Sequence, residues 1–351
     1  MPFRDVIGHR RLVRLLSRSV VRETLPPSLL FAGPAGIGKR LAAVATAQAL
    51  NCRTPEKGSY PFFGSDLPDD KEGRPLFDAC GVCAACTRIA RNVHPDVLII
   101  EPGESGSIKI EQVRDLIDRA AYRPFEGRRR VVIVDQADAL VVAAQHALLK
   151  TLEEPPPSSV FFLITSRPDV LLPTVVSRCP RLRFRPLSVE DVARVLVALG
   201  QPEGQAHAVA ATADGSIGRA LEASADELVE AREVAHHVLA HAAAFDDARR
   251  RIDGAKDLLV KTGAGGASDR EQLATHLRAM ASLLRDVELL STRADVRALA
   301  NSDVQPALER LAVTYRGERG VRAFTAVDRA LVALERNSGV KVVADWLVLQ
   351  L

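Results

Sequence analysis

The residues from Gly33 to Lys39 have the spacing of a phosphate-binding loop, G-x-x-x-x-G-K, with Gly36 inside it and Gly38 before the lysine. Glycines let backbone N–H groups curl around a phosphate, and the lysine reaches the β- and γ-phosphates of a nucleotide. In a catalytic loop the next residue is Ser or Thr, whose hydroxyl holds Mg²⁺, but here it is Arg40, which cannot ligate a metal. The motif therefore predicts a site for ATP or ADP in which efficient hydrolysis is not expected. A loop that has lost its function is the alternative.

A second phosphate-site element is the apolar run 131–134, which ends at Asp135. A carboxylate in this position supports Mg²⁺ in nucleotide hydrolases. The next residue in catalytic sites is a Glu that polarises water, whereas this chain has Gln136, whose amide cannot take a proton. A buried strand with a solvated acidic turn is the alternative interpretation. Arg40 and Gln136 both argue against catalysis by this chain.

Four cysteines form a third pattern. Cys80, Cys83 and Cys86 are separated by two residues each, and Cys52 lies upstream. This knuckle with a fourth thiolate predicts a closed tetrahedral metal site, which is structural rather than catalytic. Reactive or buried thiols are the alternative. The fifth cysteine, Cys179, lies in another motif.

Three more polar residues are candidates for contacts with nucleotide. Arg178, within Ser-Arg-Cys, could reach a neighbouring subunit's γ-phosphate from a subunit edge, although most surface arginines are solvated charges. Thr165 ends an apolar run, where a polar group that senses phosphate would lie. Arg219 is a candidate second sensor, and an arginine at the start of a helix is the alternative.

These residues are positioned by short apolar runs that alternate with amphipathic stretches. We expect strands at 28–32, 97–100, 131–134, 160–164 and, at an edge, 181–184, with helices at 39–50, 111–121 and 139–152. Such alternation predicts an α/β fold, a mostly parallel sheet with helices on both faces. After Pro186 the chain has no strong strand pattern, and we expect helices only, beginning after a Ser188 cap.

Composition limits the class of protein further. The 351 residues are 47% hydrophobic and 26% charged, which is globular, and exceed the usual size of one core. No apolar run approaches the length of a membrane span and no signal peptide is evident, so we expect a cytoplasmic protein without membrane contact. A net charge of +3 is too small to indicate a nucleic-acid wrap. The polar stretch 53–78 is interpreted as a surface insertion of unknown role.

Taken together, the motifs resemble the AAA+ subunits of the bacterial DNA polymerase III clamp loader. The resemblance covers roughly residues 3 to 220 and depends on many motifs in one order: Val6–His9, Gly33–Lys39, the cysteine knuckle, His94–Asp96, Ile108–Arg114, Asp135–Asp138, Ala147–Pro156 and Ser177–Cys179. Within that family, Arg40 and Gln136 make the chain look like the delta-prime members rather than the gamma/tau motors.

The resemblance implies three domains and a structural zinc. They are an AAA+ phosphate-loop domain with the zinc knuckle at 1–186, a small helical lid domain at 187–227 and an all-helical collar domain for oligomerisation at 228–351. The family's zinc ligands correspond to the four cysteines Cys52, Cys80, Cys83 and Cys86.

The resemblance also implies a role and partners. The chain would be a non-motor subunit that helps to assemble a ring with gamma/tau and delta subunits. It would supply Arg178 as an arginine finger to a neighbouring ATP site, so that the ring loads the sliding clamp on primed DNA within the polymerase holoenzyme. An active gamma/tau-like ATPase motor and a stand-alone nucleotide-binding regulator are the alternatives.

Overall fold

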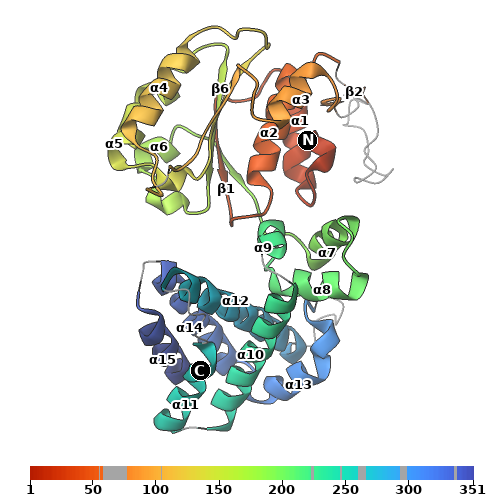
Figure 1. The fold of residues 1–351 in the computed structure, drawn as a ribbon, viewed down its shortest axis with the longest axis vertical. Coiled ribbons are helices and arrows are strands. Elements are labelled where there is room, and N and C mark those ends of the chain that lie inside the picture. The colour runs from red at the N-terminus through yellow and green to blue at the C-terminus, as the bar shows by residue number, and fades with distance from the viewer. Residues whose placement is uncertain are drawn as a thin grey trace. The chain divides into compact units, whose positions relative to one another are not determined.

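The computed structural model describes residues 1–54, 56–57, 77–103, 105–222, 225–245, 247–259, 266–292, 299–335 and 338–351. The chain divides into two compact units, Met1–Pro186 and Leu187–Leu351. The first is an α/β unit, and all described secondary-structure elements of the second are helices (Figure 1). Most of the expected insertion at 53–78 lies outside the described residues. Among those that are described, no helix is both long and apolar enough to cross a membrane.

A five-stranded parallel sheet forms the centre of the first unit. Its strands lie in the order β4-β5-β6-β1-β7. Their bounds are β1 Ser28–Ala32, β4 Val97–Ile100, β5 Arg130–Val134, β6 Ser159–Thr165 and β7 Arg181–Arg183. The expected α/β fold class, a parallel sheet with covering helices, is confirmed, and each expected strand forms within one residue of the predicted bounds.

Helices cover both faces of this sheet because successive strand residues point to opposite sides. In β6, Val160, Phe162 and Ile164 pack in one apolar cluster, while Phe161 and Leu163 pack in another. The first cluster includes α1 (Arg10–Val21), α2 (Lys39–Asn51) and α3 (Ala84–Ala90); the second includes α4 (Ile110–Ala121), α5 (Val142–Glu153) and α6 (Pro173–Val176). Figure 1 shows the two helical layers on either side of the strands.

Two local differences from the sequence expectation have physical causes. The helix expected at 139–152 is divided: residues Ala137–Ala139 form a 3-10 turn, η3, and the α-helix begins at Val142. Leu140 and Val141 between them are extended, and Ile108 pairs with Leu140 as an isolated parallel bridge. A two-stranded antiparallel ribbon, β2 (Glu56–Lys57) with β3 (Phe77–Asp78), was not expected, because two-residue strands leave no periodicity.

The second unit contains helices in all its described elements. They are α7 Val189–Ala198, α8 Glu203–Thr212, α9 Ile217–Glu222, α10 Ala225–Ala244, α11 Ala248–Gly254, α12 Gly266–Ser291, α13 Gln305–Thr314, α14 Glu318–Glu335 and α15 Val340–Gln350, with short 3-10 turns at Ala255–Leu258 and Ser302–Val304. The first unit has further 3-10 turns at Phe3–Asp5 and Pro168–Val170. The predicted cap at Ser188 forms, since its hydroxyl accepts a hydrogen bond from the Asp191 amide at 3.1 Å.

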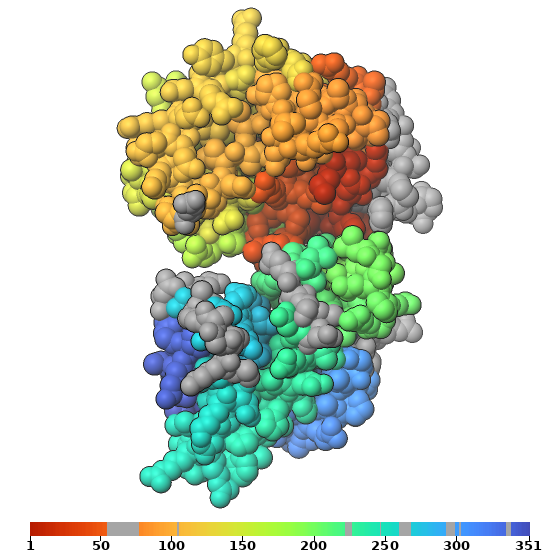
Figure 2. Space-filling model, in the orientation of Figure 1, coloured from red at the N-terminus to blue at the C-terminus, as the bar shows by residue number. Residues whose placement is uncertain are grey.

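The apolar residues of the helical unit form two clusters. One spans residues from Leu187 to Leu228 and the other spans residues from Ala231 to Leu351. Figure 2 draws the same residues as atoms, with the first unit coloured from red to yellow-green and the helical unit from green to blue. The division of this unit into a lid and a collar domain stays a prediction.

Asp96 is the main buried anchor at the amino ends of the sheet strands. Its carboxylate is fully buried and accepts hydrogen bonds from the backbone amides of Phe125, Glu126 and Gly127 at 2.6 to 2.9 Å. It also pairs with Arg130, the first residue of β5, at 2.9 Å. Burial by itself would raise the pKa of Asp96, but these donors lower it to about 2. The His94–Asp96 motif is therefore architectural.

We expect Asp96→Asn to lower the free energy of unfolding by about 3 kcal/mol, because it leaves the buried Arg130 without its counter-charge. Urea denaturation of the full chain measures this. The matched control Asp115→Asn removes an exposed pair with Arg119 and should change stability by about 0.5 kcal/mol or less.

The advantage of wild type over Asp96→Asn should depend on pH. The native pKa of Asp96 is about 2, below its ordinary value of 3.8. A carboxyl group with a lowered native pKa stabilises the fold above its unfolded pKa, and that stabilisation is lost as pH falls through the native value. The advantage should be complete at neutral pH and decline between roughly pH 4 and 2. An advantage that is independent of pH over this interval would show that the carboxylate's charge is not its cause.

Candidate functional site

The phosphate-binding loop lies between β1 and α2, as the sequence predicts. Gly33 must be glycine, because a Cβ there would lie 2.3 Å from the carbonyl oxygen of Phe184. Gly38, which caps α2, has φ +95°, a left-handed conformation that L side chains rarely adopt. Gly36 is also left-handed, with φ +70°. The loop therefore keeps the backbone conformation that its glycines permit, and its chemistry depends on the residues that follow.

Lys39 is the first residue of α2 and is only 6% exposed. Its Nζ donates to the carbonyl oxygen of Gly33 at 2.6 Å and to that of Pro34. Burial lowers the pKa of Lys39 to about 8, although the carboxylates of Asp135 and Asp138 oppose the shift. The ammonium group thus lies within the loop and is held by the loop's own carbonyls.

Arg40 occupies the part of the site where a magnesium ion would be held. One guanidinium nitrogen, Nη1, lies 2.8 Å from Oε2 of Glu101 and 3.0 Å from Oδ2 of Asp135. The other carboxylate oxygen of Asp135 accepts the Gln136 amide at 3.0 Å. A metal hydroxyl ligand is missing after Lys39, and a cation already pairs with the carboxylate that would support the ion. The residues present therefore do not fit a magnesium ion.

Gln136 and Asp138 follow Asp135 in the turn after β5. Gln136 is exposed and has φ +52°, a left-handed backbone that is uncommon outside glycine and costs on the order of 1 kcal/mol. The partly buried carboxylate of Asp138 accepts hydrogen bonds from the Thr165 hydroxyl at 2.8 Å and from Nε of Arg167 at 3.0 Å. Burial raises the pKa of Asp138, but these hydrogen bonds outweigh it and lower the pKa below its usual value.

The structure brings most of the predicted nucleotide residues together at the carboxyl edge of the sheet. Lys39, Arg40, Asp135 and Thr165 are linked there through shared carboxylates. Glu101 and Arg167 belong to the same edge and were not predicted. Only their positions in the sequence could have indicated this role: Glu101 directly follows the strand 97–100, and Arg167 lies two residues after β6.

Arg178 lies apart from these contacts, two residues after the end of α6. Its Nε donates to Oε1 of Glu153, the last residue of α5, at 2.7 Å, and Nη2 donates to the same oxygen. Nη1 donates to the carbonyl oxygen of Thr174 at 2.8 Å. The arginine and glutamate side chains are 32% and 48% exposed, so this ion pair borders solvent. Exposed pairs contribute about 1 kcal/mol or less, which makes the arginine available to a stronger partner.

Arg219 lies on α9 within the helical unit. Its guanidinium is 3.6 Å from Asp214, and its amide donates to the hydroxyl of Ser216 at 3.2 Å. Burial lowers the pKa of Arg219, and the positive charge of Arg278 adds to the effect. Both arginines line a cavity of about 330 Å³ in this unit. A sensor role for Arg219 stays a prediction.

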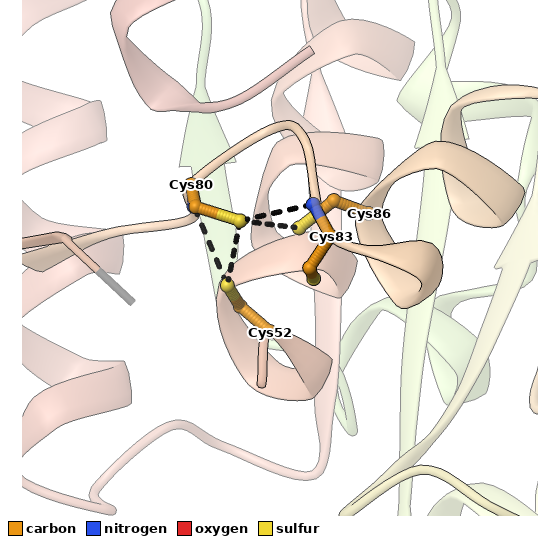
Figure 3. A group of neighbouring side chains, drawn as sticks. All are labelled: Cys52, Cys80, Cys83 and Cys86. Carbon is orange, nitrogen blue, oxygen red and sulfur yellow. Dashed lines mark hydrogen bonds between the residues drawn. The ribbon is translucent and has the colours of Figure 1, made fainter. Parts of the chain in front are cut away.

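The four predicted metal ligands form a compact cluster (Figure 3). Cys52 directly follows α2, Cys80 follows β3, Cys83 caps α3 and Cys86 lies in its first turn. All four Sγ atoms lie within 4.8 Å of one another, with 3.6 Å between those of Cys52 and Cys80. Bonds of 2.3 Å from a tetrahedral zinc to sulfur would place the sulfurs about 3.8 Å apart. The cluster therefore has the ligands and the spacing to hold a metal ion such as zinc.

Hydrogen bonds prepare two of these thiols for the thiolate state that metal binding needs. Burial by itself would raise the pKa of Cys80, but the Thr54 hydroxyl and the Cys83 amide, at 3.3 and 3.2 Å from its Sγ, lower it. Burial by itself would raise the pKa of Cys83, but hydrogen bonds from the backbone of Cys86 and Arg53 and from neighbouring thiols together lower it to about 6. Cys179 lies outside the cluster, and burial raises its pKa to about 11.

Comparison with known proteins adds sequence evidence. The family described as DNA polymerase III, delta subunit, matches residues 8–188. The chain is 40% identical over 151 residues to DNA polymerase III subunit delta' of Pseudomonas aeruginosa, a match that covers 43% of this chain and 40% of that protein. It is 30% identical over 243 residues to subunit delta' of Bacillus subtilis, which covers 67% of each chain.

Subunit tau of Bacillus subtilis is also similar, at 30% identity over 225 residues that cover 62% of this chain and 36% of that protein. The chain thus spans about a third of the length of this tau relative. Among solved structures, a DNA polymerase III gamma subunit-related protein from Thermotoga maritima aligns over 95% of this chain and 96% of that chain, at 15% identity and a TM-score of 0.38. The sequence matches, rather than this distant structural one, carry the comparison.

Proposed function

The chain belongs to the DNA polymerase III delta subunit family as a delta-prime-like clamp-loader subunit, and we propose that it serves as a non-motor member of the loader ring. In this role it helps to assemble the ring with gamma/tau and delta subunits. It also supplies Arg178 as an arginine finger to the ATP site of a neighbouring subunit. Through the complex it acts on the sliding clamp and primed DNA.

The contact between Arg40 and Asp135 is the observation that carries the non-motor assignment. Hydrolysis needs a metal ion beside the β- and γ-phosphates and a group that orients the attacking water. Arg40 pairs with the carboxylate that would support the metal, and Gln136 stands where a base would be. The chain's own loop thus lacks both elements of catalysis, while its backbone and Lys39 remain suited to phosphate.

Arg178 is suited to act in trans for two reasons. Its guanidinium borders solvent, and its present partner Glu153 is itself exposed, so exchange for a phosphate costs little. A planar guanidinium also binds two oxygens of a phosphoryl group at once, and it stabilises the charge that develops on them as the terminal phosphate leaves. Glu153 then holds the arginine while no neighbouring nucleotide is within reach.

We propose the three-domain division for assembly as well, with the lid at 187–227 and the collar at 228–351. The separate apolar clusters below and above residue 230 support it. The larger cluster would form the core of the collar, whose outer surface joins the ring.

The arginine-finger role is tested in a loader reconstituted with clamp and primed DNA, where only this subunit is varied. Arg178→Ala should slow hydrolysis at the neighbouring site by about 10³-fold. The ATPase rate of the ring should fall by the amount that the neighbouring site contributes, and clamp loading should fail. Lys39→Ala in this subunit should change the ATPase rate by about twofold at most, because its own loop does not hydrolyse ATP.

Two controls accompany this experiment. Arg178→Lys keeps the charge but loses the forked geometry, so it should restore little activity. Arg181→Ala removes an exposed arginine three residues further along the chain, and it should leave the ATPase rate near that of wild type. Gel filtration establishes that each ring assembles.

A gamma/tau-like motor is the second candidate, and the intact loop with Lys39 is the observation that favours it. It predicts that Lys39→Ala alone abolishes this subunit's share of hydrolysis while Arg178→Ala has little effect. That result would exclude the non-motor role.

We also propose that the cysteine cluster holds one structural zinc ion, on the strength of its four thiol ligands and their spacing. Protein purified without chelator should contain about one zinc per chain. Cys86→Ser should lose the metal and lower the Tm by about 5 °C or more, because metal binding contributes to folding. Cys179→Ser, a buried cysteine outside the cluster, should retain the zinc. Metal analysis that finds wild type free of zinc would contradict the assignment.

A further inference from the structure

The guanidinium group of Arg40 makes hydrogen bonds through only one of its three nitrogens among the described residues. Both of its hydrogen bonds use Nη1, which contacts Glu101 and Asp135. A guanidinium carries five N–H donors in a plane. Its Nε and Nη2 therefore have no partner among the described residues, and the side chain is 41% exposed. The two carboxylates fix the group beside the loop and leave its remaining donors for an anion.

The loop beside Arg40 provides further groups that can bind an anion. Lys39 lies beside Arg40 with its ammonium inside the loop, bonded only to carbonyl oxygens that a phosphate can replace. Gly38, in a left-handed conformation, is the N-cap of α2, a helix of 13 residues. The N-terminus of this helix therefore faces the loop. Two side-chain cations and a helix N-terminus thus converge where a polyphosphate would bind.

We propose that Arg40 takes the place of the magnesium ion, and that this loop binds a metal-free nucleoside diphosphate. The proposal deepens the non-motor role above, on which it rests, by naming the ligand of the idle site. Mg²⁺ demands oxygen ligands in octahedral geometry, whereas here a guanidinium lies 3.0 Å from the Asp135 oxygen that would serve it. A metal ion that entered with the nucleotide would meet this positive charge.

Charge favours a diphosphate over a triphosphate. A magnesium ion would bring two positive charges to the β- and γ-phosphates, and Arg40 brings one. The site's two cations, Lys39 and Arg40, are also partly balanced by the carboxylates of Glu101 and Asp135. A metal-free triphosphate would leave more negative charge uncompensated than a diphosphate. The bound nucleotide would then be a stable ligand of the subunit rather than a substrate.

The test measures binding of ADP to the full chain by calorimetry, once with excess EDTA and once with excess Mg²⁺. Wild type should bind ADP in EDTA at least as tightly as in Mg²⁺, and more tightly than it binds ATP in EDTA. Arg40→Thr restores the metal-holding hydroxyl and frees Asp135. Its binding in EDTA should be about tenfold weaker than that of wild type, and Mg²⁺ should strengthen it. Circular dichroism establishes that the variant is folded.

Arg194→Thr is the matched control. It makes the same substitution at an exposed arginine of α7 that pairs with Asp191 at 3.0 Å in the helical unit. Its affinity for ADP should equal that of wild type in both buffers. If Arg194→Thr weakened ADP binding as much as Arg40→Thr does, the loss of any positive charge would explain the weaker binding.

Two results would overturn the inference. One is a wild-type affinity for ADP that requires Mg²⁺, and the other is no binding of ADP in either buffer. Neither would affect the role of Arg178, which the reconstituted loader tests separately. Conversely, ATPase activity that depends on Lys39 would exclude the non-motor role whatever the metal dependence of ADP binding.

Discussion

The parallel direction of all five strands is the constraint on which the site depends. Parallel strands end at the same edge, so residues that follow different strands meet there although they are far apart in the chain. Arg40 comes after β1, Glu101 after β4 and Asp135 after β5, and Arg40 contacts both carboxylates. At the opposite edge, Asp96 fastens the start of β5 through Arg130 and so helps to set the position of Asp135.

A single side chain changes the chemistry of this edge without changing its backbone. The glycines and Lys39 preserve the geometry of a phosphate site. Arg40 places a fixed positive charge where nucleotide hydrolases recruit a metal ion, and a fixed charge cannot provide open coordination positions for water and phosphate oxygens. One loop can therefore keep the geometry for binding phosphate while its residues no longer fit a metal ion, as the proposed non-motor role requires.

The two arginine–carboxylate pairs at Asp96 and Arg178 differ in exposure, and this difference separates their roles. Breaking the buried Asp96–Arg130 pair would leave an uncompensated charge inside the protein, so that pair is permanent architecture. Breaking the exposed Arg178–Glu153 pair returns both groups to water at little cost. The same chemical contact is thus an anchor in one place and, under our proposal for Arg178, a temporary partner in the other.

The sequence by itself determined the strands of the large sheet, the loop and the cysteine knuckle, because these depend on local patterns. The buried strands are apolar runs, the loop is one continuous motif, and three of the four cysteines lie within seven residues. Only the tertiary structure decided what Arg40 and Arg178 contact. Glu101 and Asp135 lie 61 and 95 residues from Arg40, and Glu153 lies 25 residues from Arg178. No periodicity records such pairings, since they arise from how strands and helices pack and not from the spacing of residues along any one of them.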